Sequence, residues 1–595
     1  MHWLKGFGMK SDETPNLILV NALYDGIDSR ERGFQLGLLY ISTYVEEKGF
    51  RTKILVGENV TKRIIWELER SQEKPLLGFY VSADNEHEVI RCATVVKSMH
   101  PDCPIIFGGP EARVKPEQIL NNKVADYVCT GDGEDCVLDL MNVLFRNNGT
   151  LEKVPNLAYL NGDKLKFGHS PHSKANLDLD RLPIPKRESF DPRYMDPSMI
   201  ATARGCVSKC TFCFEGTSVK LRRHSVARVI EEMKYLQNTF ATKYFAFTDD
   251  TFTSDARKVY DLSAAIAENF HPHVDATWYC EAKVSDLCRD INMAKTMVGA
   301  GLVRAQVGSE SGNQNILDLY RKEIETWQIV EATEMLYDSG IVSIFTNFII
   351  GGVCETIKTF EESLELALSL MHAAPGVLEC ASTFLSPYSG TDIRLNPERY
   401  DVELVDDQFI TGSSDSYIFA RSKHLTSEQV LSMGKEFYSA HRNAMDEIYP
   451  SLSSDIIRRQ LEMGLFGLTS NWHQYLVEDG ILARWFDFRR RGYDKQISPE
   501  ESKLSAIIPT RTMAMESSSQ DKFIWLRRKR LLRFSALEKA LIELASGKIT
   551  LPEIVERTFT QFGNDYMSKH TFQTAIIDFY NRMADEFLIC FRRFS

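Results

Sequence analysis

Short apolar runs alternate with longer helical patterns along the first part of the chain. The apolar runs fall at residues 17–21, 53–56, 76–82, 105–109 and 127–130, and helical patterns at residues 37–48 and 86–99 lie between them. Such an alternation is typical of parallel strands joined by crossover helices. We therefore predict an N-terminal doubly wound parallel sheet of the α/β class, extended by a β-hairpin at residues 158–165.

A second alternation of strand and helix patterns begins after a proline-rich stretch at residues 182–197, which indicates a domain boundary. The predicted strands are residues 199–202, 244–248, 276–280, 304–307, 343–350 and 378–384, and the clearest helices are residues 226–237 and 326–339. Repeated βα units of this kind predict a partial β/α barrel.

The remainder of the chain is mainly helical. Residues 427–490 carry helical patterns, and a strand-like run at residues 523–527 precedes three helices at residues 537–545, 551–559 and 572–587. This order predicts a small winged-helix-like module. Because 595 residues exceed one ordinary hydrophobic core, we divide the chain into domains at residues 1–180, 181–426, 427–515 and 516–595.

Composition narrows the class of protein. Hydrophobic residues make up 43% and charged residues 26% of the chain, as in folded globular proteins. The net charge of -12 argues against a general nucleic-acid binder. Twelve sparse, irregularly spaced cysteines fit a reducing compartment. Since no secretory signal or membrane span is evident, we predict a cytoplasmic protein without a membrane partner.

Three cysteines form a compact cluster directly after the first predicted barrel strand: Cys206, Cys210 and Cys213. A structural zinc site would need a fourth Cys or His at comparable spacing, and the sequence places none nearby. Iron-sulfur clusters are normally held by four cysteines, so three would leave one iron open to another ligand. The alternative is that the three thiols are incidental.

The Cys-x3-Cys-x2-Cys spacing resembles that of radical S-adenosylmethionine (SAM) enzymes. Later segments support the resemblance at residues 247–252, 307–312 and 347–356. It implies a 4Fe-4S cluster on the three cysteines, whose open iron binds SAM, and a 5'-deoxyadenosyl radical that abstracts hydrogen. The resemblance also implies which residues contact SAM: Phe212, Asp249, Asp250, Glu281, Gly308, Glu310, Ile350 and Gly351.

These assignments have simpler alternatives. Asp249 or Asp250 could cap the following helix, Gly351 could be a turn glycine, and Glu310 could be a solvated carboxylate. The sequence also departs from many relatives, because Glu281-Ala282-Lys283 stands where an arginine is expected. The partner of the SAM carboxylate therefore stays open.

The N-terminal sheet resembles the cobalamin-binding domain that precedes the barrel in one branch of these enzymes. The resemblance rests on residues 37–40 and on Ser82, Gly108, Gly109, Gly131, Gly133 and Glu134, which it implies as cobalamin contacts. Residues 23–35 contain no histidine, so the resemblance implies a cobalamin whose lower face is not held by histidine. A sheet that has lost its cofactor is the alternative, because a glycine-rich α/β fold does not specify a ligand.

The last seventy or so residues resemble a peptide-binding module typified by the carrier protein of pyrroloquinoline quinone biosynthesis, which binds a leader peptide as an extra strand. A winged helix can also be a structural cap or a DNA reader. The basic run at residues 527–530 would suit DNA, an acidic leader or simply a solvated face.

Three hypotheses follow. The first is a cobalamin-dependent radical SAM enzyme that methylates an unactivated carbon of a ribosomally made peptide and draws electrons from a flavodoxin or ferredoxin. The second keeps the radical without cobalamin, for rearrangement, epimerisation or cyclisation of a peptide or small metabolite. The third is a ligand-sensing DNA-binding regulator that contains a cluster.

Overall fold

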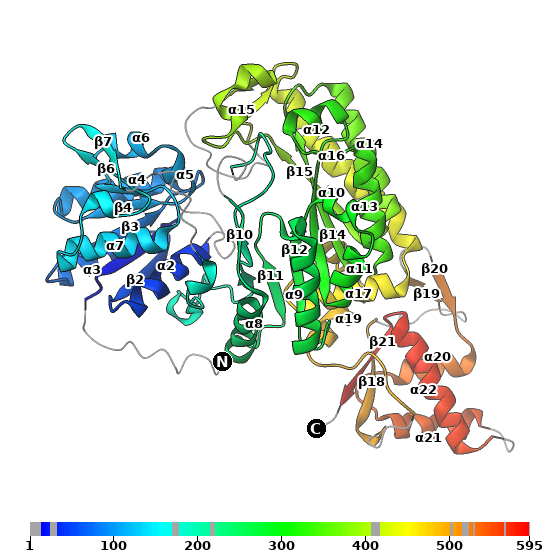
Figure 1. Ribbon diagram of the computed structural model, residues 1–595. Helices are drawn as coiled ribbons and strands as arrows, with labels where there is room; N and C mark the ends of the chain where they lie inside the picture. The colour runs from blue at the N-terminus through cyan, green and yellow to red at the C-terminus, as the bar shows by residue number, and fades with distance from the viewer. Residues whose placement is uncertain are drawn as a thin grey trace.

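The structure is a computed structural model of the whole chain. It describes residues 14–23, 33–168, 178–214, 220–405, 417–499, 504–513, 523–526, 530–563 and 567–593. Figure 1 shows an N-terminal α/β domain beside a central parallel sheet, followed by a helical layer and a C-terminal module.

The N-terminal domain is a seven-stranded sheet of order β2-β1-β3-β4-β5-β6-β7. Its strands are β1 (Leu17–Ala22), β2 (Thr52–Gly57), β3 (Leu76–Tyr80), β4 (Ile105–Gly108), β5 (Tyr127–Cys129), β6 (Leu157–Asn161) and β7 (Lys164–Phe167). Its helices are α2 (Leu36–Glu47), α3 (Val60–Arg70), α4 (Glu86–Met99), α5 (Pro110–Val114), α6 (Pro116–Asn121) and α7 (Gly133–Arg146). The first five strands are parallel, and β6 and β7 form the predicted antiparallel hairpin.

Buried side chains alternate across this sheet because successive strand residues point to opposite faces. Along β1, Leu17 and Leu19 pack with α2 and α7 on one face, whereas Ile18 and Val20 pack with α3 and α4 on the other. Two apolar layers therefore enclose the sheet, as a doubly wound fold requires.

The linker to the barrel is part of the N-terminal core. Leu182, Phe190 and Tyr194 are buried in the same cluster as Leu17 and Leu19. A Cβ on Gly57 would lie 2.4 Å from the Tyr194 hydroxyl, so this glycine makes room for the tyrosine. Side chains from beyond residue 180 thus contribute to the N-terminal core.

The central domain is an open six-stranded parallel sheet of order β15-β14-β13-β12-β11-β8. Its strands are β8 (Met199–Ile200), β11 (Tyr244–Phe247), β12 (Thr277–Ala282), β13 (Leu302–Glu310), β14 (Ser343–Ile350) and β15 (Leu378–Phe384). A separate antiparallel hairpin joins β9 (Ala203–Arg204) and β10 (Arg222–Arg223). The helices are α8 (Val226–Phe240), α9 (Ala256–Asn269), α10 (Val284–Arg289), α11 (Met293–Gly299), α12 (Gln314–Tyr320), α13 (Thr326–Asp338), α14 (Ile357–Ala373) and α15 (Asp392–Leu395).

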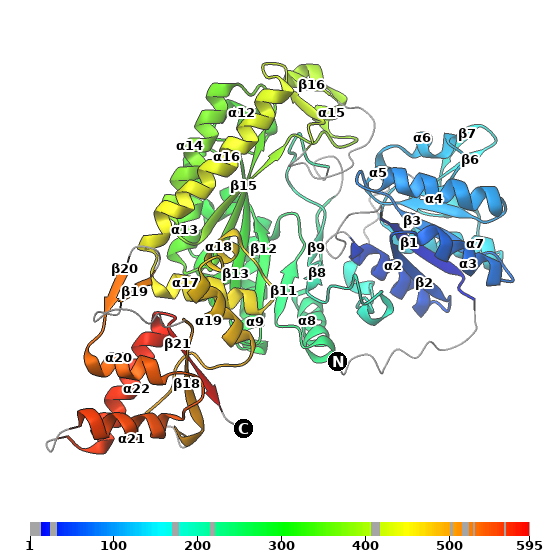
Figure 2. The same cartoon turned by 180° about the vertical axis from the view of Figure 1, so that it is seen from behind.

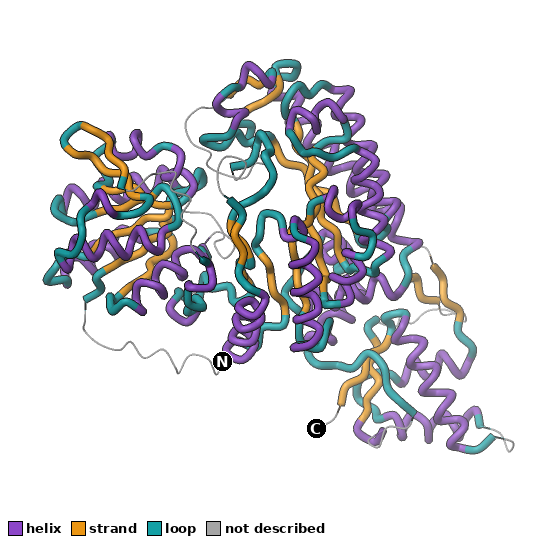
Figure 3. Tube along the Cα trace, in the orientation of Figure 1, coloured by secondary structure: helices purple, strands orange, loops and turns teal. Residues whose placement is uncertain are grey.

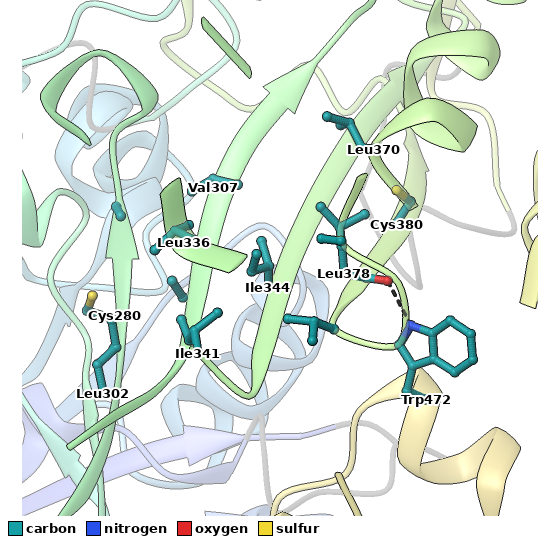
Figure 4. Packing of buried hydrophobic residues seen from close by; sticks show 14 of the residues in the cluster. Cys280, Leu302, Val307, Leu336, Ile341, Ile344, Leu370, Leu378, Cys380 and Trp472 are labelled. Atoms are coloured by element: carbon teal, nitrogen blue, oxygen red, sulfur yellow. Dashed lines mark hydrogen bonds between the residues drawn. The ribbon is translucent and has the colours of Figure 1, made fainter. Parts of the chain in front are cut away.

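Helices cover the outer face of this sheet, and the two faces differ in polarity. Figure 4 shows Val307, Ile344 and Leu378 packed in one cluster with Leu336 of α13 and Leu370 of α14. Positions that alternate with the buried ones are only partly buried and largely polar: Tyr279, Glu281, Arg304, Gln306, Phe345 and Asn347. They form the concave face of the half barrel.

The helical region packs beside the edge strand β15, as Figure 2 shows for α16. Its helices are α16 (Ser427–Ile448), α17 (Ser454–Leu465), α18 (Asn471–Leu476) and α19 (Gly480–Arg490), and a small hairpin of β16 (Val402–Leu404) and β17 (Ala420–Ser422) precedes them. The indole of Trp472 donates to the carbonyl of Leu378 at 2.8 Å (Figure 4).

The C-terminal module has its own hydrophobic core. It contains β18 (Ile507–Arg511), β19 (Phe523–Leu526), β20 (Arg530–Arg533), α20 (Ala536–Leu544), α21 (Leu551–Phe562), α22 (Lys569–Asp585) and β21 (Ile589–Arg593). Strand β18 pairs with β21, and Ile497 joins the module's core. A strand and an isoleucine from the predicted helical region thus contribute to the sheet and core of this module. Residues 527–529 of the basic run lie outside the described residues.

The predicted fold class is confirmed: two parallel-sheet domains are followed by a helical region and a small α/β module (Figure 3). All twelve cysteines are free thiols. Within the described ranges, every helix is too short or too polar to cross a membrane.

Candidate functional site

The three cysteines lie on a loop whose stem is the β9–β10 hairpin. Arg204 pairs with Arg222 across this stem, and the three cysteines follow directly after its first strand. Gly205 opens the loop with a φ of +88°, a conformation that side chains with a Cβ rarely adopt. All three thiols are partly exposed.

The thiol of Cys206 makes two long contacts. The Sγ of Cys206 lies 3.6 Å from Thr251 Oγ1 and accepts from the Ser208 amide at 3.4 Å. Backbone bonds fix the loop instead, since the Thr211 amide donates to Tyr320 O at 3.1 Å and the Thr211 carbonyl accepts from the Ile393 amide at 3.2 Å.

This arrangement fits a multinuclear cluster. Among the described residues, no three Cys, His, Asp or Glu side chains converge as a single metal ion requires. In a 4Fe-4S cluster each cysteine binds a different iron, so the sulfurs need not converge on one point. Three accessible thiols on one anchored loop are suited to that role.

Phe212 lies between two of the cysteines and packs against the barrel. Its ring meets Tyr320 edge-on at 5.0 Å between centroids, and the Lys322 ammonium lies 6.0 Å from its centre. The aromatic residue is therefore fixed beside the thiols, where the sequence predicted an adenine contact.

The carboxylate of Asp249 binds the backbone at the start of the stem. It is buried and accepts from the amides of Thr202 at 2.7 Å and Ala203 at 2.9 Å, and from the Thr202 hydroxyl. Burial raises the pKa of Asp249 to about 6, although these donors oppose the shift. The cap of α9 is Asp255, so neither Asp249 nor Asp250 caps that helix.

Acidic residues gather at the carboxyl ends of β11, β12 and β13. Burial raises the pKa of Glu281 to about 7, and the nearby charges of Asp250 and Glu310 add to the shift. The Tyr279 hydroxyl lies 3.5 Å from Glu281 Oε1 and donates to Gln306 Oε1 at 3.0 Å. Glu281 can therefore hold or release a proton near neutral pH.

Glu310 is buried and paired, not solvated. Its Oε1 accepts from Lys322 Nζ at 3.1 Å, and its backbone has a φ of +62°. A Cβ on Gly308 would lie 2.4 Å from Glu310 Oε1 and 2.7 Å from Lys322 Nζ. Gly308 thus provides the space in which this ion pair forms.

The end of β14 holds a carboxyl group to which the sequence assigned no role. Ile350 is buried, and Gly351 follows with a φ of +74°. The amides of Gly351 and Gly352 both donate to Glu355 Oε2, the second at 3.3 Å. Burial raises the pKa of Glu355 to about 8. Its position within the 347–356 segment was the signal that could have pointed to it.

A cavity of about 320 Å³ lies between the two domains. Its lining comes from the N-terminal domain, the stem and the residues that follow β8 and β11: Leu36, Gly37, Tyr40, Arg113, Asp132, Ala201, Ala203, Arg204, Gly205, Arg222, Thr248 and Asp250. A Cβ on Gly37 would meet no atom within 4 Å, so α2 leaves open space beside this glycine. Of the described residues that line the cavity, none is a histidine.

The other residues assigned to cobalamin lie at the carboxyl ends of β3, β4 and β5, but only some have free space. The Ser82 amide donates to Asn85 Oδ1 at 2.8 Å. A Cβ on Gly109 would lie 2.7 Å from Val81 O, and one on Gly131 would lie 2.7 Å from Asn156 Cγ. Gly108 has only an ordinary contact at 3.7 Å.

Two further residues of this set serve packing and charge pairing. A Cβ on Gly133 would lie 2.5 Å from Ile41 Cδ1 of α2. Glu134 is buried and bound by Arg204 of the stem. The sequence missed Arg113, Arg204 and Arg222, because their partners are distant along the chain. The Arg113 guanidinium lies 4.0 Å from the ring centre of Phe214, beside Cys213.

Comparison with known families identifies both parallel-sheet domains. The profile of the radical SAM superfamily matches residues 200–367, and that of the B12 binding domain matches residues 26–140. These ranges contain the cysteine loop and the carboxyl edge that faces it.

Similar proteins include methyltransferases and a cyclase. The chain is 26% identical to the uncharacterized methyltransferase PH0819 of Pyrococcus horikoshii, over 68% of this chain and 87% of the relative. It is 23% identical to the anaerobic magnesium-protoporphyrin IX monomethyl ester cyclase of Rubrivivax gelatinosus, over 55% and 60% of the two chains.

The fold is similar to that of the radical SAM methyltransferase TsrM from Kitasatospora setae, solved with cobalamin and a [4Fe-4S] cluster. The TM-score is 0.58 at 17% identity, over 71% of this chain and 91% of that chain. Another structure of TsrM contains a tryptophan substrate.

Proposed function

We propose that this chain, which belongs to the radical SAM enzymes that carry a B12-binding domain, transfers a methyl group to an unactivated carbon. The observation that carries the proposal is the cavity between the domains. It is lined by Gly37 and Tyr40 on the cobalamin-binding side and by Gly205, directly before Cys206, on the other. Chemistry at both cofactors requires them to face one shared space.

When bound, the 4Fe-4S cluster with SAM supplies a hydrogen-abstracting radical, and cobalamin supplies the methyl group. Cys206, Cys210 and Cys213 would hold three irons of the cluster. Gly37 and Gly108, beside which the structure leaves space, would give cobalamin close access to the backbone.

The remaining site residues position SAM and handle protons. Phe212 would lie against adenine, while Ile350, Gly351 and the Glu310–Lys322 pair would border the nucleoside. Asp249 would act through the stem that it supports. Asp250 and Glu281 would face the methionine amino group, and Glu281 can give up a proton at neutral pH.

The substrate we propose is a ribosomally made peptide, held through its leader by the C-terminal module. The module's separate core and its short sheets β18–β21 and β19–β20 support this choice, because sheet edges accept peptides as added strands. A small-molecule substrate is the second candidate, favoured by the tryptophan bound to the similar TsrM.

An anaerobic reaction of the reconstituted enzyme tests the proposal. The protein receives SAM, a flavodoxin or ferredoxin as reductant, and peptides encoded beside its gene. We expect 5'-deoxyadenosine and S-adenosylhomocysteine together, with a peptide that gains one methyl group. The Cys206→Ala variant should lose both nucleoside products by at least about 100-fold, because it removes a cluster ligand.

The product pattern separates the alternatives. 5'-Deoxyadenosine without S-adenosylhomocysteine would overturn methyl transfer and favour cobalamin-independent radical chemistry. Both products with tryptophan-like metabolites, and neither methylated peptide nor peptide binding, would overturn the peptide assignment alone.

A further inference from the structure

Both strands of the cysteine-loop stem are bound by carboxylates of the other domain. Arg204 donates from Nη2 to Glu134 Oε1 at 2.7 Å and from Nη1 to Glu134 Oε2 at 3.2 Å, and its Nη1 also lies 3.3 Å from Asp132 Oδ1. Arg222 donates from Nη2 to Asp132 Oδ1 at 3.2 Å and from Nη1 to Asp132 Oδ2. Each arginine therefore binds one carboxylate in a bidentate manner, through two hydrogen bonds.

The two carboxylates come from one turn of the N-terminal domain. Asp132 precedes α7, and Glu134 lies in its first turn, directly after β5. The turn lies at the carboxyl edge of the sheet, and Asp132 lines the cavity between the domains. The stem of the cluster loop is thus joined to the edge where the B12-binding domain carries its predicted cofactor contacts.

These contacts are largely shielded from solvent. The Glu134 side chain is 2% exposed, and those of Arg222 and Arg204 are 12% and 20% exposed. Although burial opposes it, the hydrogen bonds of Arg222 and the charge of Arg204 keep the pKa of Asp132 below its usual range. The guanidinium carbon of Arg204 lies over the Tyr40 ring, 4.8 Å from the ring centre. Two cations and two anions balance, so no net charge is buried.

We propose that these four residues, called here the interdomain clamp (Asp132, Glu134, Arg204 and Arg222), fix the separation and orientation of the cluster loop relative to the cobalamin-binding edge. They are positioning residues for the reaction. The functional part of the inference rests on the proposed function, whereas the mechanical part does not. A spacing device is needed because SAM must react at the cluster and at cobalamin from one cavity.

Hydrogen exchange on the cofactor-free protein tests the mechanical part. In Glu134→Gln, amides of β9, β10 and the start of α7 should exchange about tenfold faster, because one strong charge-assisted hydrogen bond is lost. The matched control is Glu67→Gln, which removes a largely buried carboxylate paired with Lys53 in the same domain, away from the stem. Equal exchange at the stem in both variants would overturn the clamp.

Product coupling in the loaded enzyme tests the functional part. Glu134→Gln should keep its cluster content and its 5'-deoxyadenosine formation within about twofold, while S-adenosylhomocysteine formation falls about tenfold. Arg204→Lys keeps the positive charge but cannot bind a carboxylate through two parallel hydrogen bonds. We therefore expect the same fall in S-adenosylhomocysteine formation, with 5'-deoxyadenosine formation retained. Pulsed electron paramagnetic resonance between reduced cluster and cob(II)alamin should show a broader distance distribution.

The outcomes can be told apart. An unchanged product ratio and distance distribution would overturn the positioning role. An equal fall of both products with lost cofactor would mean a merely structural role and would also overturn it. If the unaltered enzyme forms no S-adenosylhomocysteine, the proposed function fails instead, and hydrogen exchange still decides the mechanical part.

Discussion

Glu355 shows how one buried carboxyl group makes stability depend on pH. Its pKa is raised from the ordinary 4.5 to about 8 because it is enclosed at the end of β14. Between these values the folded protein keeps a proton that the unfolded chain has released. Raising the pH through this window therefore lowers the unfolding free energy, and this loss of stability levels off above about pH 8.

Replacing this group with Gln should remove that dependence. A Gln oxygen can still accept from the amides of Gly351 and Gly352. Relative to the parent protein, we expect the unfolding free energy of Glu355→Gln to rise by roughly 2–4 kcal/mol as the pH increases from about 5 to about 8. Thermal melting across that range measures the gain, with Glu361→Gln on the exposed face of α14 as control. A constant difference at every pH would contradict the assignment.

At the residue scale, the sequence was informative where the chemistry is local. Cys206, Cys210 and Cys213 lie within eight residues of one another, and their spacing alone indicated a cluster. Glu310 was placed at a strand end, but its partner Lys322 lies in the connection between α12 and α13, which carries no motif. Arg204 and Glu134 are 70 positions apart, so only the fold brings them together.

At the scale of elements, a buried ion triad joins the linker to α8. Glu232 lies 2.6 Å from Arg187 Nη2 and accepts from Arg228 Nη1 at 2.9 Å, and the side chains of Arg187 and Glu232 are at most 1% exposed. Arg187 also donates to the carbonyls of Pro185 and Met199. The triad therefore fixes the chain's entry into β8.

Breaking this triad should be costly, because two buried arginines would lose their anion. We expect Glu232→Gln to lower the unfolding free energy by about 3 kcal/mol. Glu231→Gln, the exposed neighbour on the same helix, should change it by less than about 0.5 kcal/mol. Urea unfolding of both variants provides the comparison, and similar values for the two would contradict the role of the triad.

Periodicity predicted elements better than it predicted their partners. Apolar runs that alternate with helical patterns along the chain identified both sheets, since such patterns are local. Strand β18 escaped notice because it lies far from its partner β21, with three helices between them. Its sequence, Ile507–Arg511, contains Pro509, which weakens any strand signal.

At the scale of the whole molecule, the boundary between the first two domains was the hardest to place, because prolines suggest a linker wherever they cluster. Residues 182–197 contribute Leu182, Phe190 and Tyr194 to the N-terminal core, although Arg187 and Glu188 also contact α8. Tyr194 fills the space left by Gly33 and Gly57, and Asp191 lies 4.0 Å from Arg63. We propose that the independent N-terminal unit ends near residue 198.

Two fragments distinguish this boundary from the earlier one. A fragment of residues 1–198 retains Leu182, Phe190 and Tyr194, whereas a fragment of residues 1–180 exposes the surface that they cover. Each buried apolar side chain contributes about 1.5–3 kcal/mol, so the longer fragment should be more stable by about 5 kcal/mol. Urea unfolding should show one cooperative transition for the longer fragment. The shorter fragment should unfold at a lower urea concentration or aggregate. If both fragments unfold at the same urea concentration, the linker adds nothing to this core, and the domain ends at residue 180 after all.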